Sequence, residues 1–357
     1  MTEPTLTTEE LRLLASAGGA APSLHNSQPW RLRWSAATTS LRVYADRERS
    51  MPLTDPDGRA LHISVGAALF NLRVAAQHLG LQPVVRLLPE EGEPDLLAVL
   101  DLSRAATAPS TLDLALGRGA DPGHPTARSR NPAATPSGRD LYPAVAFRHS
   151  SRRPFANRDV PEAVLGELIA AARAEGALLS PLEEDGVRRV SALTAEAEQR
   201  TADDPARLAE IGRWLRPAEP ADGPDSAPDG IPQYALGPQD HDARVPMRGF
   251  TGHPPRPAVP SERFEALPQL CTLTTLGDRP AHWLRAGQAL EHVWLLATVH
   301  GVRLSVLNQA LEWPDTRWAL RDPATGPGHV QLVVRLGYGP PGPTTPRRAV
   351  PEILTAD

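Results

Sequence analysis

Apolar and polar residues follow two different spacings along this chain. In some stretches they alternate, which is typical of one buried face of a strand, and in others apolar residues recur every three to four positions, which is typical of a helix. In the N-terminal part the spacing predicts helices at 8–20 and 61–79 and strands at 30–34, 41–46, 83–88 and 96–102. In the C-terminal part it predicts helices at 161–174, 186–216 and 280–300 and strands at 177–182, 270–276, 302–306 and 330–338, the last being the final strand.

Two stretches have neither spacing and are rich in proline and small residues. Residues 105–140 are expected to form a long connection, which divides the chain into a first half, 1–104, and a second half, 141–357. Residues 217–260 are dense in proline and are expected to form a loop-rich insert in the second half. Such an insert serves either as a lid over a binding site or as a surface excursion.

Residues 62–81 and 283–302 resemble each other. In this register Gly66 matches Gly287, and the glycine that ends each predicted helix also matches. A glycine near a helix start permits close approach of two backbones, and a glycine after a helix suits a left-handed cap. Amphipathic spacing alone explains part of the similarity, but both segments also lead into a strand, which favours an internal duplication. Two such halves can pack about a pseudo-two-fold axis, as the subunits of a dimer do.

Composition limits the class of protein. The 357 residues are 41% hydrophobic and 22% charged, which is normal for a globular chain of one large or two ordinary domains. No apolar run is long enough for a transmembrane helix, and the N-terminus is acidic, so no membrane anchor or secretory signal is predicted. A single cysteine excludes an internal disulfide. The net charge of −5 gives no overall attraction to nucleic acid, and a cytoplasmic location is expected.

The stretch 21–34, A-P-S-L-H-N-S-Q-P-W-R-L-R-W, concentrates polar side chains between two prolines. Proline fixes the backbone angle φ and lacks an N–H, so this is expected to be a stiff loop that presents polar groups in a set direction. The alternative is a helix-to-strand connector rich in turn-forming residues. The polar residues are Ser23, His25, Asn26, Ser27 and Gln28.

A second cluster, R-H-S-S-R-R at 148–153, carries three arginines and two hydroxyls shortly before a predicted helix. Arginine offers paired donors to phosphate oxygens, so the cluster predicts an anion site, and the alternative is a solvated basic loop. The pair Arg347 and Arg348 could reach the same anion from the C-terminal tail. Other catalytic motifs are missing from the sequence: there is no phosphate-binding glycine loop, no G-x-S-x-G and no H-E-x-x-H, and no metal site is expected.

These segments resemble known motifs. P-S-L-H-N-S-Q-P-W at 22–30 resembles the P-S-x-x-N-x-Q-P-W motif of the FMN-dependent nitroreductase superfamily, and R-H-S-S-R at 148–152 resembles its R-x-S-x-R motif. The stretch 336–348 resembles its closing strand and basic C-terminal arm. In ordinary members the arginine motif comes first and each FMN lies between two subunits. Here the order is reversed, and each half keeps only one of the two motifs.

This arrangement is similar to the Acg-like branch of that superfamily, in which one chain mimics a nitroreductase dimer. The resemblance implies an α+β fold with two tandem nitroreductase-like halves, each a mostly antiparallel sheet with long helices, packed as a pseudo-dimer. One complete site would then form between the halves of a single chain, while the second site would lack both motifs.

The resemblance also implies which residues bind FMN. The phosphate and ribityl chain would be held by Arg148, Ser150 and Arg152, with His149 contributing through its backbone. From the other half the flavin or its phosphate would meet Pro22, Ser23, Leu24 and Asn26. The segment whose backbone faces the flavin N5 corresponds to Val306, Leu307, Asn308 and Gln309. The basic arm on the phosphate corresponds to Arg347 and Arg348.

The implied activity is that of an FMN-binding oxidoreductase that takes hydride from NAD(P)H and passes electrons to a nitroaromatic, a quinone or another small acceptor. No catalytic side chain is required, because the flavin carries the chemistry. Two alternatives stay open: an FMN storage or sequestration protein lidded by the insert, and a specialised flavin-dependent biosynthetic dehydrogenase. A monomer or a weak homodimer is expected.

Overall fold

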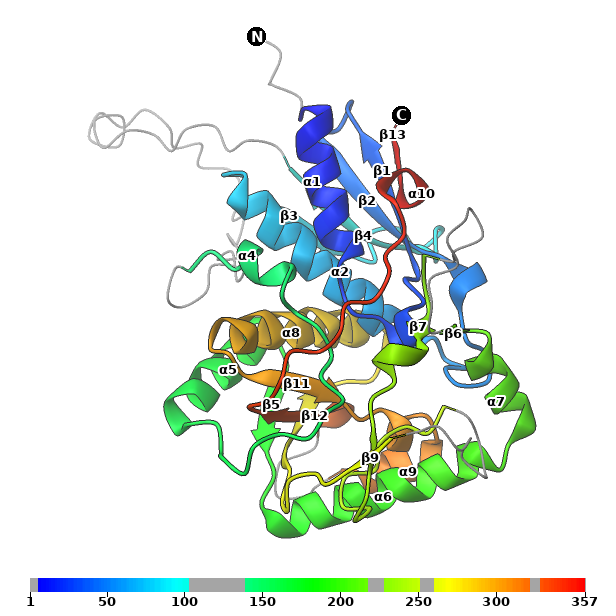
Figure 1. Cartoon of the computed structure of the whole chain (residues 1–357). Helices are drawn as coiled ribbons and strands as arrows, with labels where there is room; N and C mark the ends of the chain where they lie inside the picture. The colour runs from blue at the N-terminus through cyan, green and yellow to red at the C-terminus, as the bar shows by residue number, and fades with distance from the viewer. Residues whose placement is uncertain (1–5, 103–138, 218–227, 251–259, 322–327, 357) are drawn as a thin grey trace.

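The computed structural model describes residues 6–102, 139–217, 228–250, 260–321 and 328–356. Most of the connection predicted at 105–140 and two parts of the insert predicted at 217–260 therefore lie outside the described residues. The described chain forms two α+β halves, one above the other in Figure 1, with the C-terminal segment running from the second half back to the first.

The first half builds a five-stranded sheet beside two helices. Its elements are α1 (Thr8–Gly19), β1 (Trp30–Ser35), β2 (Ser40–Ala45), α2 (Arg59–His78), β3 (Val84–Leu87) and β4 (Leu96–Asp101). The strand order is β13-β1-β2-β4-β3, where β13 (Leu354–Ala356) comes from the end of the chain and pairs parallel with β1. The other pairings are antiparallel. Side chains of β1 alternate between buried and exposed, as the spacing predicts.

The second half builds an antiparallel four-stranded sheet, β11-β12-β10-β5. Its strands are β5 (Leu178–Pro181), β10 (Gln269–Thr275), β11 (Arg303–Val306) and β12 (His329–Gly337). Its helices are α4 (Tyr142–Val145), α5 (Glu162–Ala174), α6 (Glu184–Ala202), α7 (Pro205–Gly212), α8 (Pro280–Val299), α9 (Pro314–Ala319) and α10 (Val350–Ile353). Short strands in and around the insert are β6 (Leu215–Arg216), β7 (Ile231–Pro232), β8 (Gln239–Asp240) and β9 (Ser261–Glu262).

Three expectations need correction. The helix predicted over 186–216 is broken, because the Asp204 carboxylate caps a new helix that begins at Pro205, and its last residues form a short strand instead. The short helices α4, α9 and α10 have no counterpart among the predicted helices. The strand at 330–338 is not the last one, since β13 follows it and closes the edge of the first sheet.

Helices α2 and α8 pack against each other at the centre of the molecule (Figure 1). A Cβ on Gly66 would overlap the carbonyl oxygen of Leu284, and a Cβ on Gly287 would overlap the carbonyl oxygen of Ile63. Gly287 and Leu284 lie 221 positions after Gly66 and Ile63, so the two contacts are the same contact with the halves exchanged. This reciprocity confirms the predicted pseudo-dimer, and glycine is required at both positions because only it lets the backbones approach so closely.

The hydrophobic core is shared in the same way. Leu284 of α8 belongs to the cluster around the first sheet, whereas Ile63 and Phe70 of α2 belong to the cluster around the second. Both long helices end on a left-handed glycine, Gly80 and Gly301, as the repeat predicts. Each half therefore buries apolar surface of the other, and neither core is complete alone.

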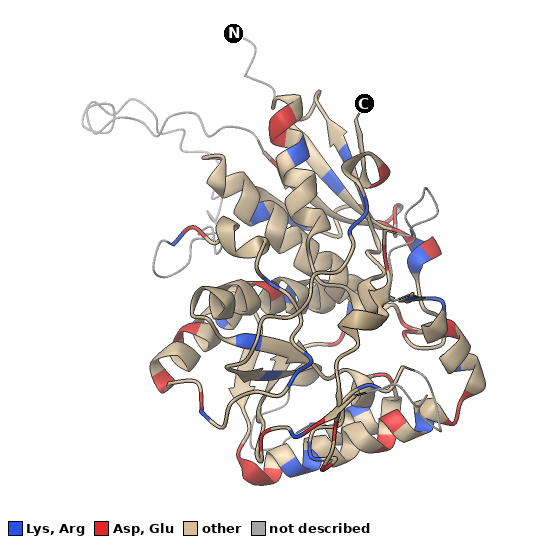
Figure 2. Cartoon of the chain, viewed as in Figure 1, with Lys and Arg blue, Asp and Glu red and all other residues tan. Residues whose placement is uncertain are grey.

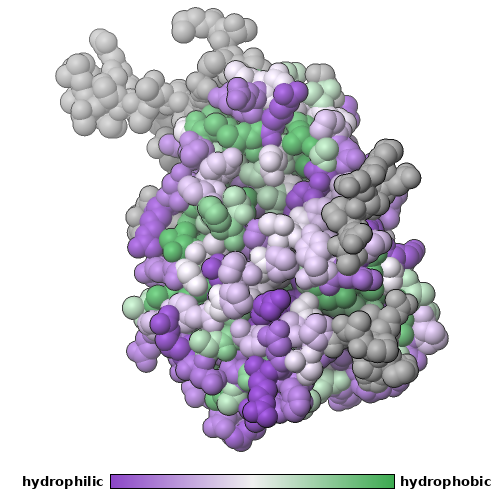
Figure 3. Space-filling view, in the orientation of Figure 1, coloured by the Kyte–Doolittle hydropathy of each residue, from purple (hydrophilic) through white to green (hydrophobic). Residues whose placement is uncertain are grey.

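Polar residues cover the outside. Acidic and basic residues are interspersed along α6 (Figure 2), and the face in Figure 3 is mixed, with an apolar patch at its upper end over the first half. None of the helices in the described ranges is long and apolar enough to cross a membrane.

Candidate functional site

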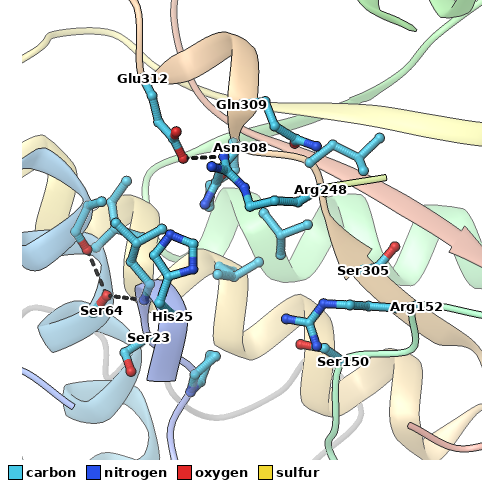
Figure 4. A pocket seen from close by; sticks show the side chains of 18 of the residues that line it. Ser23, His25, Ser64, Ser150, Arg152, Arg248, Ser305, Asn308, Gln309 and Glu312 are labelled. Atoms are coloured by element: carbon cyan, nitrogen blue, oxygen red, sulfur yellow. Dashed lines mark hydrogen bonds and ion pairs between the residues drawn. The ribbon is translucent and has the colours of Figure 1, made fainter. Parts of the chain in front are cut away.

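A pocket lies where the two halves meet, and residues of the insert close one side of it (Figure 4). Its empty volume is about 940 Å³ with the solvent at its mouth included. Of the residues predicted from sequence, it is lined by Pro22, Ser23, Leu24, Ser150, Arg152, Val306, Leu307, Asn308 and Gln309. Segments from opposite ends of the chain thus meet at one cavity.

The loop from the first half holds an unusual backbone. His25, Asn26 and Gln28 all have positive φ values, between 49° and 56°. Such conformations cost about 1–3 kcal/mol each unless the surroundings impose them. Here the Ser64 hydroxyl accepts from the Leu24 N–H at 3.3 Å, and the Ser23 hydroxyl accepts from the Gln28 N–H at 2.9 Å. The stiff loop predicted from the two prolines is therefore held in place by side-chain hydrogen bonds.

Asn26 does not line the pocket but joins three parts of the chain. Its Nδ2 donates to the carbonyls of Gly230 at 2.8 Å and Pro346 at 3.0 Å, and its Oδ1 accepts from Arg347 Nη1 at 2.9 Å. Arg348 also bonds to the loop, since its N–H donates to Gln28 Oε1 at 2.8 Å. The structure thus places Asn26, Arg347 and Arg348 just behind the pocket wall, where they fasten the C-terminal arm and the insert to the loop.

Arg148 is also outside the pocket lining. Its side chain is 2% exposed, forms an ion pair with Glu291 at 3.2 Å and donates to the Ala20 carbonyl at 3.0 Å. Its guanidinium lies over Trp294, which does line the pocket. Burial lowers the pKa of Arg148 and raises that of Glu291 to about 7, although each charge partly stabilises the other.

Positive charge gathers next to Arg148. Burial, and then the charge of Arg148, lower the pKa of Arg347 to about 9. The pKa of half-buried His149 is lowered by burial and by the same two arginines. Arg347 Nε is buried and has no hydrogen-bond partner among the residues that the structure describes. This group of cations, with Glu291 as its buried counter-charge, is suited to an anion.

Arg152 points into the pocket beside Ser150 (Figure 4). Its Nη1 donates to the Ala235 carbonyl of the insert at 3.0 Å, and no carboxylate of the described chain forms an ion pair with it. Burial and the nearby charge of Arg248 lower its pKa to about 10. Arg152 is therefore a partly buried cation without a carboxylate partner in the described chain.

The residues predicted to bind FMN do not include several lining residues, among them His25, Arg59, Met247, Arg248, Phe250 and Glu312. His25 belongs to the predicted polar loop, and Glu312 follows the predicted segment 306–309, so their positions in the sequence are a usable signal. The insert residues carry no periodic pattern that could place them. Arg248 reaches the pocket because Glu312 pairs with it at 2.6 Å, while Glu198 accepts from the neighbouring Gly249 N–H.

The pocket is suited to an anionic ligand with apolar parts. Arginines and hydroxyls lie around it (Figure 4), and Ile63, Leu290 and Leu332 are among its apolar lining residues. Within the described ranges, no group of three or more His, Cys, Asp or Glu residues could hold a metal ion.

Comparisons with known proteins agree with the motifs. No family model matches the chain. It is 30% identical over 354 residues to the candidate NAD(P)H nitroreductase Rv3131 of Mycobacterium tuberculosis, covering 97% of this chain and 91% of that protein. It is 27% identical over 364 residues to the candidate NAD(P)H nitroreductase acg of the same organism, covering 99% and 98%.

Solved structures show weaker similarity. The FMN- and NADPH-dependent nitroreductase NfnB of Sphigopyxis sp. strain HMH has a TM-score of 0.37 at 15% identity, covering 60% of this chain and 97% of that one. A nitroreductase of Bacteroides fragilis with bound FMN has a TM-score of 0.35 at 15% identity, covering 59% and 94%.

Proposed function

Because this chain belongs to the nitroreductase family, in its Acg-like branch, we propose that it binds FMN in the pocket between its halves and acts as an NAD(P)H-dependent oxidoreductase. One observation carries the proposal. The two family motifs, far apart in the sequence and in reversed order, both contribute side chains to a single pocket. A shared cofactor explains this convergence more simply than two independent structural roles.

The cations behind the pocket fit the phosphate of FMN. Such a phosphate carries a charge of about −2 near neutral pH. Arg148 and Arg347 both donate to the Ala20 carbonyl, at 3.0 and 3.3 Å, so their guanidinium groups lie close together. A dianion beside them would satisfy the unpartnered Arg347 Nε and offset the repulsion that lowers the pKa of Arg347. Ser23 and Ser150, which line the pocket, would offer hydroxyl donors.

The remaining pocket fits the flavin ring. Arg152 would lie near its pyrimidine edge, where reduced flavin carries negative charge, and residues 306–309 would line the opposite edge through their backbone. When bound, FMN supplies the two-electron chemistry by which a nicotinamide donor reduces a second small molecule. The chain's own task is to orient the ring, exclude water and stabilise its charge.

We expect one FMN per chain. The repeat relates Trp294, beside the pocket, to Arg73 on the other long helix. Arg73 is buried and pairs with Glu175 at 2.6 Å and with Gln288 at 2.8 Å. Glu175 directly follows α5, at the place where the second half would need its own asparagine loop to bind a second FMN. We propose that the ion pair of Glu175 with Arg73 occupies that place instead. A monomer then contains one complete site, and we expect it in the cytoplasm.

Removal of Arg152 tests the cofactor assignment. Arg152→Ala should release FMN, with affinity reduced about tenfold or more, because a charge-assisted hydrogen bond contributes about 1.5–3 kcal/mol. Arg139→Ala, on an exposed arginine away from the pocket, is the matched control and should retain FMN. Equal FMN content of the two purified variants, measured by visible absorbance, would contradict the assignment, and a colourless wild-type protein that takes up no FMN would contradict the function.

The alternative of FMN storage is favoured by one observation. The insert lines the pocket and is fastened to both halves, through Asn26 to Gly230 and through Arg248 to Glu312. A closed cover would limit access of a nicotinamide donor. If the protein is yellow and anaerobic NADH and NADPH both leave its visible absorbance unbleached, storage is favoured over reductase activity.

A further inference from the structure

Five buried polar atoms that belong to residues lining the pocket have no hydrogen-bond partner in the described chain. They are His25 Nε2, Arg248 Nη1, Ser305 Oγ, Asn308 Oδ1 and Glu312 Oε2. Buried polar groups are almost always paired, because an unpaired one costs about 1–3 kcal/mol. Asn308 belongs to the segment that the family resemblance assigns to FMN, whereas His25, Arg248 and Glu312 do not. Part of the pocket is therefore prepared for something other than FMN.

Residues of the insert form one wall of the pocket, and this wall carries Arg248. Met247, Arg248 and Phe250 are close together in the sequence of the insert, and all three line the pocket. The Arg248 side chain is 10% exposed, and Glu312 binds one of its terminal nitrogens, Nη2, at 2.6 Å (Figure 4). This pairing fixes the guanidinium in place and leaves its other terminal nitrogen free to donate to a ligand.

His25 stands across from that guanidinium. It is buried, its ring makes an edge contact with Phe250 at 5.6 Å, and its backbone is left-handed. Burial, and then the charges of Arg248 and Arg152, hold the pKa of His25 well below its ordinary value of 6.5. The imidazole is therefore neutral at physiological pH and can donate or accept one hydrogen bond without adding charge.

The pocket also has an excess of positive charge. Arg59, Arg152 and Arg248 line it, and Glu312 is the acidic residue among the lining residues of the described chain. The proposed flavin would lie against Arg152. Glu312 offsets the charge of Arg248 on the side of the insert, but Arg248 Nη1 still lacks an acceptor among the described residues.

We infer that His25, Arg248 and Phe250 form a subsite for a planar aromatic second ligand that carries an anionic oxygen, such as a carboxylate. The inference rests on the proposed function and adds the chemical class of the acceptor. Arg248 Nη1 would donate to the anionic oxygen, His25 would complete its hydrogen bonding, and Phe250 would cover the ring edge-on or in a stacked contact.

A second cavity adjoins the pocket and is a candidate entrance for the second ligand. This cavity, about 1180 Å³ with its open solvent included, shares Leu24, Arg59, Ala60, Asn308 and Glu312 with the pocket. Its other walls include Trp318, which is 67% exposed, and Trp313. A flat aromatic ligand could enter through this neighbouring cavity while the contacts of the insert remain closed.

Two aromatic probes, one with a carboxylate and one with the neutral methyl ester in its place, test the inference. The FMN-loaded full chain is titrated calorimetrically with 4-nitrobenzoate and with its methyl ester, without a reductant. We expect the wild-type chain to bind the acid at least tenfold more tightly than the ester. The variant Arg248→Gln/Glu312→Gln removes both charges together, so that neither is left buried alone, and it should lose this preference. Arg244→Gln, on an exposed arginine of the same insert, is the control and should keep it.

Each outcome decides the question. Equal affinity of acid and ester for the wild-type chain, or a preference that survives in the double variant, would overturn the subsite. If the double variant does not fold, His25→Asn replaces it, because asparagine tolerates the left-handed backbone at this position. His25→Asn should reduce the preference for the acid severalfold. An unchanged preference would overturn the inference. A wild-type chain that takes up no FMN would overturn the proposed function itself. The visible absorbance of FMN shows this before any titration, so the two failures are distinguished.

Discussion

The contact between α2 and α8 makes a quantitative prediction for Gly287→Ala. A Cβ at this position would overlap the Ile63 carbonyl oxygen and lie 2.8 Å from its carbon and 2.9 Å from the Ala67 nitrogen, whereas ordinary contact begins at 3.4 Å. These are backbone atoms, which cannot rotate away, so the helices must separate. Overpacking of this kind costs about 1–3 kcal/mol.

The opposing term is helix propensity, because alanine in a helix is favoured over glycine by about 1 kcal/mol. Since the overlap involves backbone on every side, we expect the upper end of the overpacking range and a net loss of about 2 kcal/mol in the free energy of unfolding. Gly166→Ala is the matched control: Gly166 lies on the exposed face of α5 with nothing within 4 Å of its built Cβ, and its replacement should stabilise the protein slightly.

Urea unfolding of the three proteins, followed by tryptophan fluorescence, gives the comparison. The reasoning would be refuted if Gly287→Ala unfolded at the same urea concentration as the wild-type chain, or if Gly166→Ala were destabilised equally. Gly66→Ala should behave like Gly287→Ala, because the repeat places it in the reciprocal contact.

Three further predictions concern the ion pairs and the C-terminus. Between pH 4.5 and about 7 the folded chain retains a proton on Glu291 that the unfolded chain has released. The free energy of unfolding should therefore fall by up to about 3 kcal/mol as the pH rises through this range. Glu291→Gln should abolish this dependence on pH, measured by urea unfolding at each pH. Glu175→Ala leaves Arg73 buried without its carboxylate and should cost about 3–5 kcal/mol, whereas Glu184→Ala at an exposed pair should cost less than about 1 kcal/mol. Deletion of 349–357 removes β13 and uncovers the edge of β1, so light scattering should detect aggregation that the full chain does not show.

The central helices could be predicted because their information is local. The three-to-four spacing of apolar residues identifies α2 and α8, and the matched glycines Gly66 and Gly287 indicate close approach of backbones. The polar loop at 22–30 and the arginine cluster at 148–152 also carried a local signal, since each concentrates groups that suit one kind of ligand. Their meeting at one pocket follows from the duplication.

Other features depend on contacts that no local pattern encodes. Residues 354–356 have a weak strand signal and become a strand because β1 offers an unpaired edge beside them. Met247, Arg248 and Phe250 reach the pocket because Glu312 and Glu198 hold the insert there, and a proline-rich loop has no periodicity that would reveal such partners. The burial of Arg148 could not be read from a basic sequence either, since its counter-charge, Glu291, lies on a helix more than a hundred residues later.

The return of the chain to its starting sheet has a consequence for biosynthesis. Synthesis proceeds from the N-terminus, and domains that are complete early can fold while later residues are still being made. Here β1 receives its neighbour from residues 354–356, and the loop at Asn26 receives Arg347. Neither contact can form until residues 347–356 have left the ribosome. The sheet of the N-terminal half therefore keeps an open edge while the second half is being synthesised, although its own strands are made first.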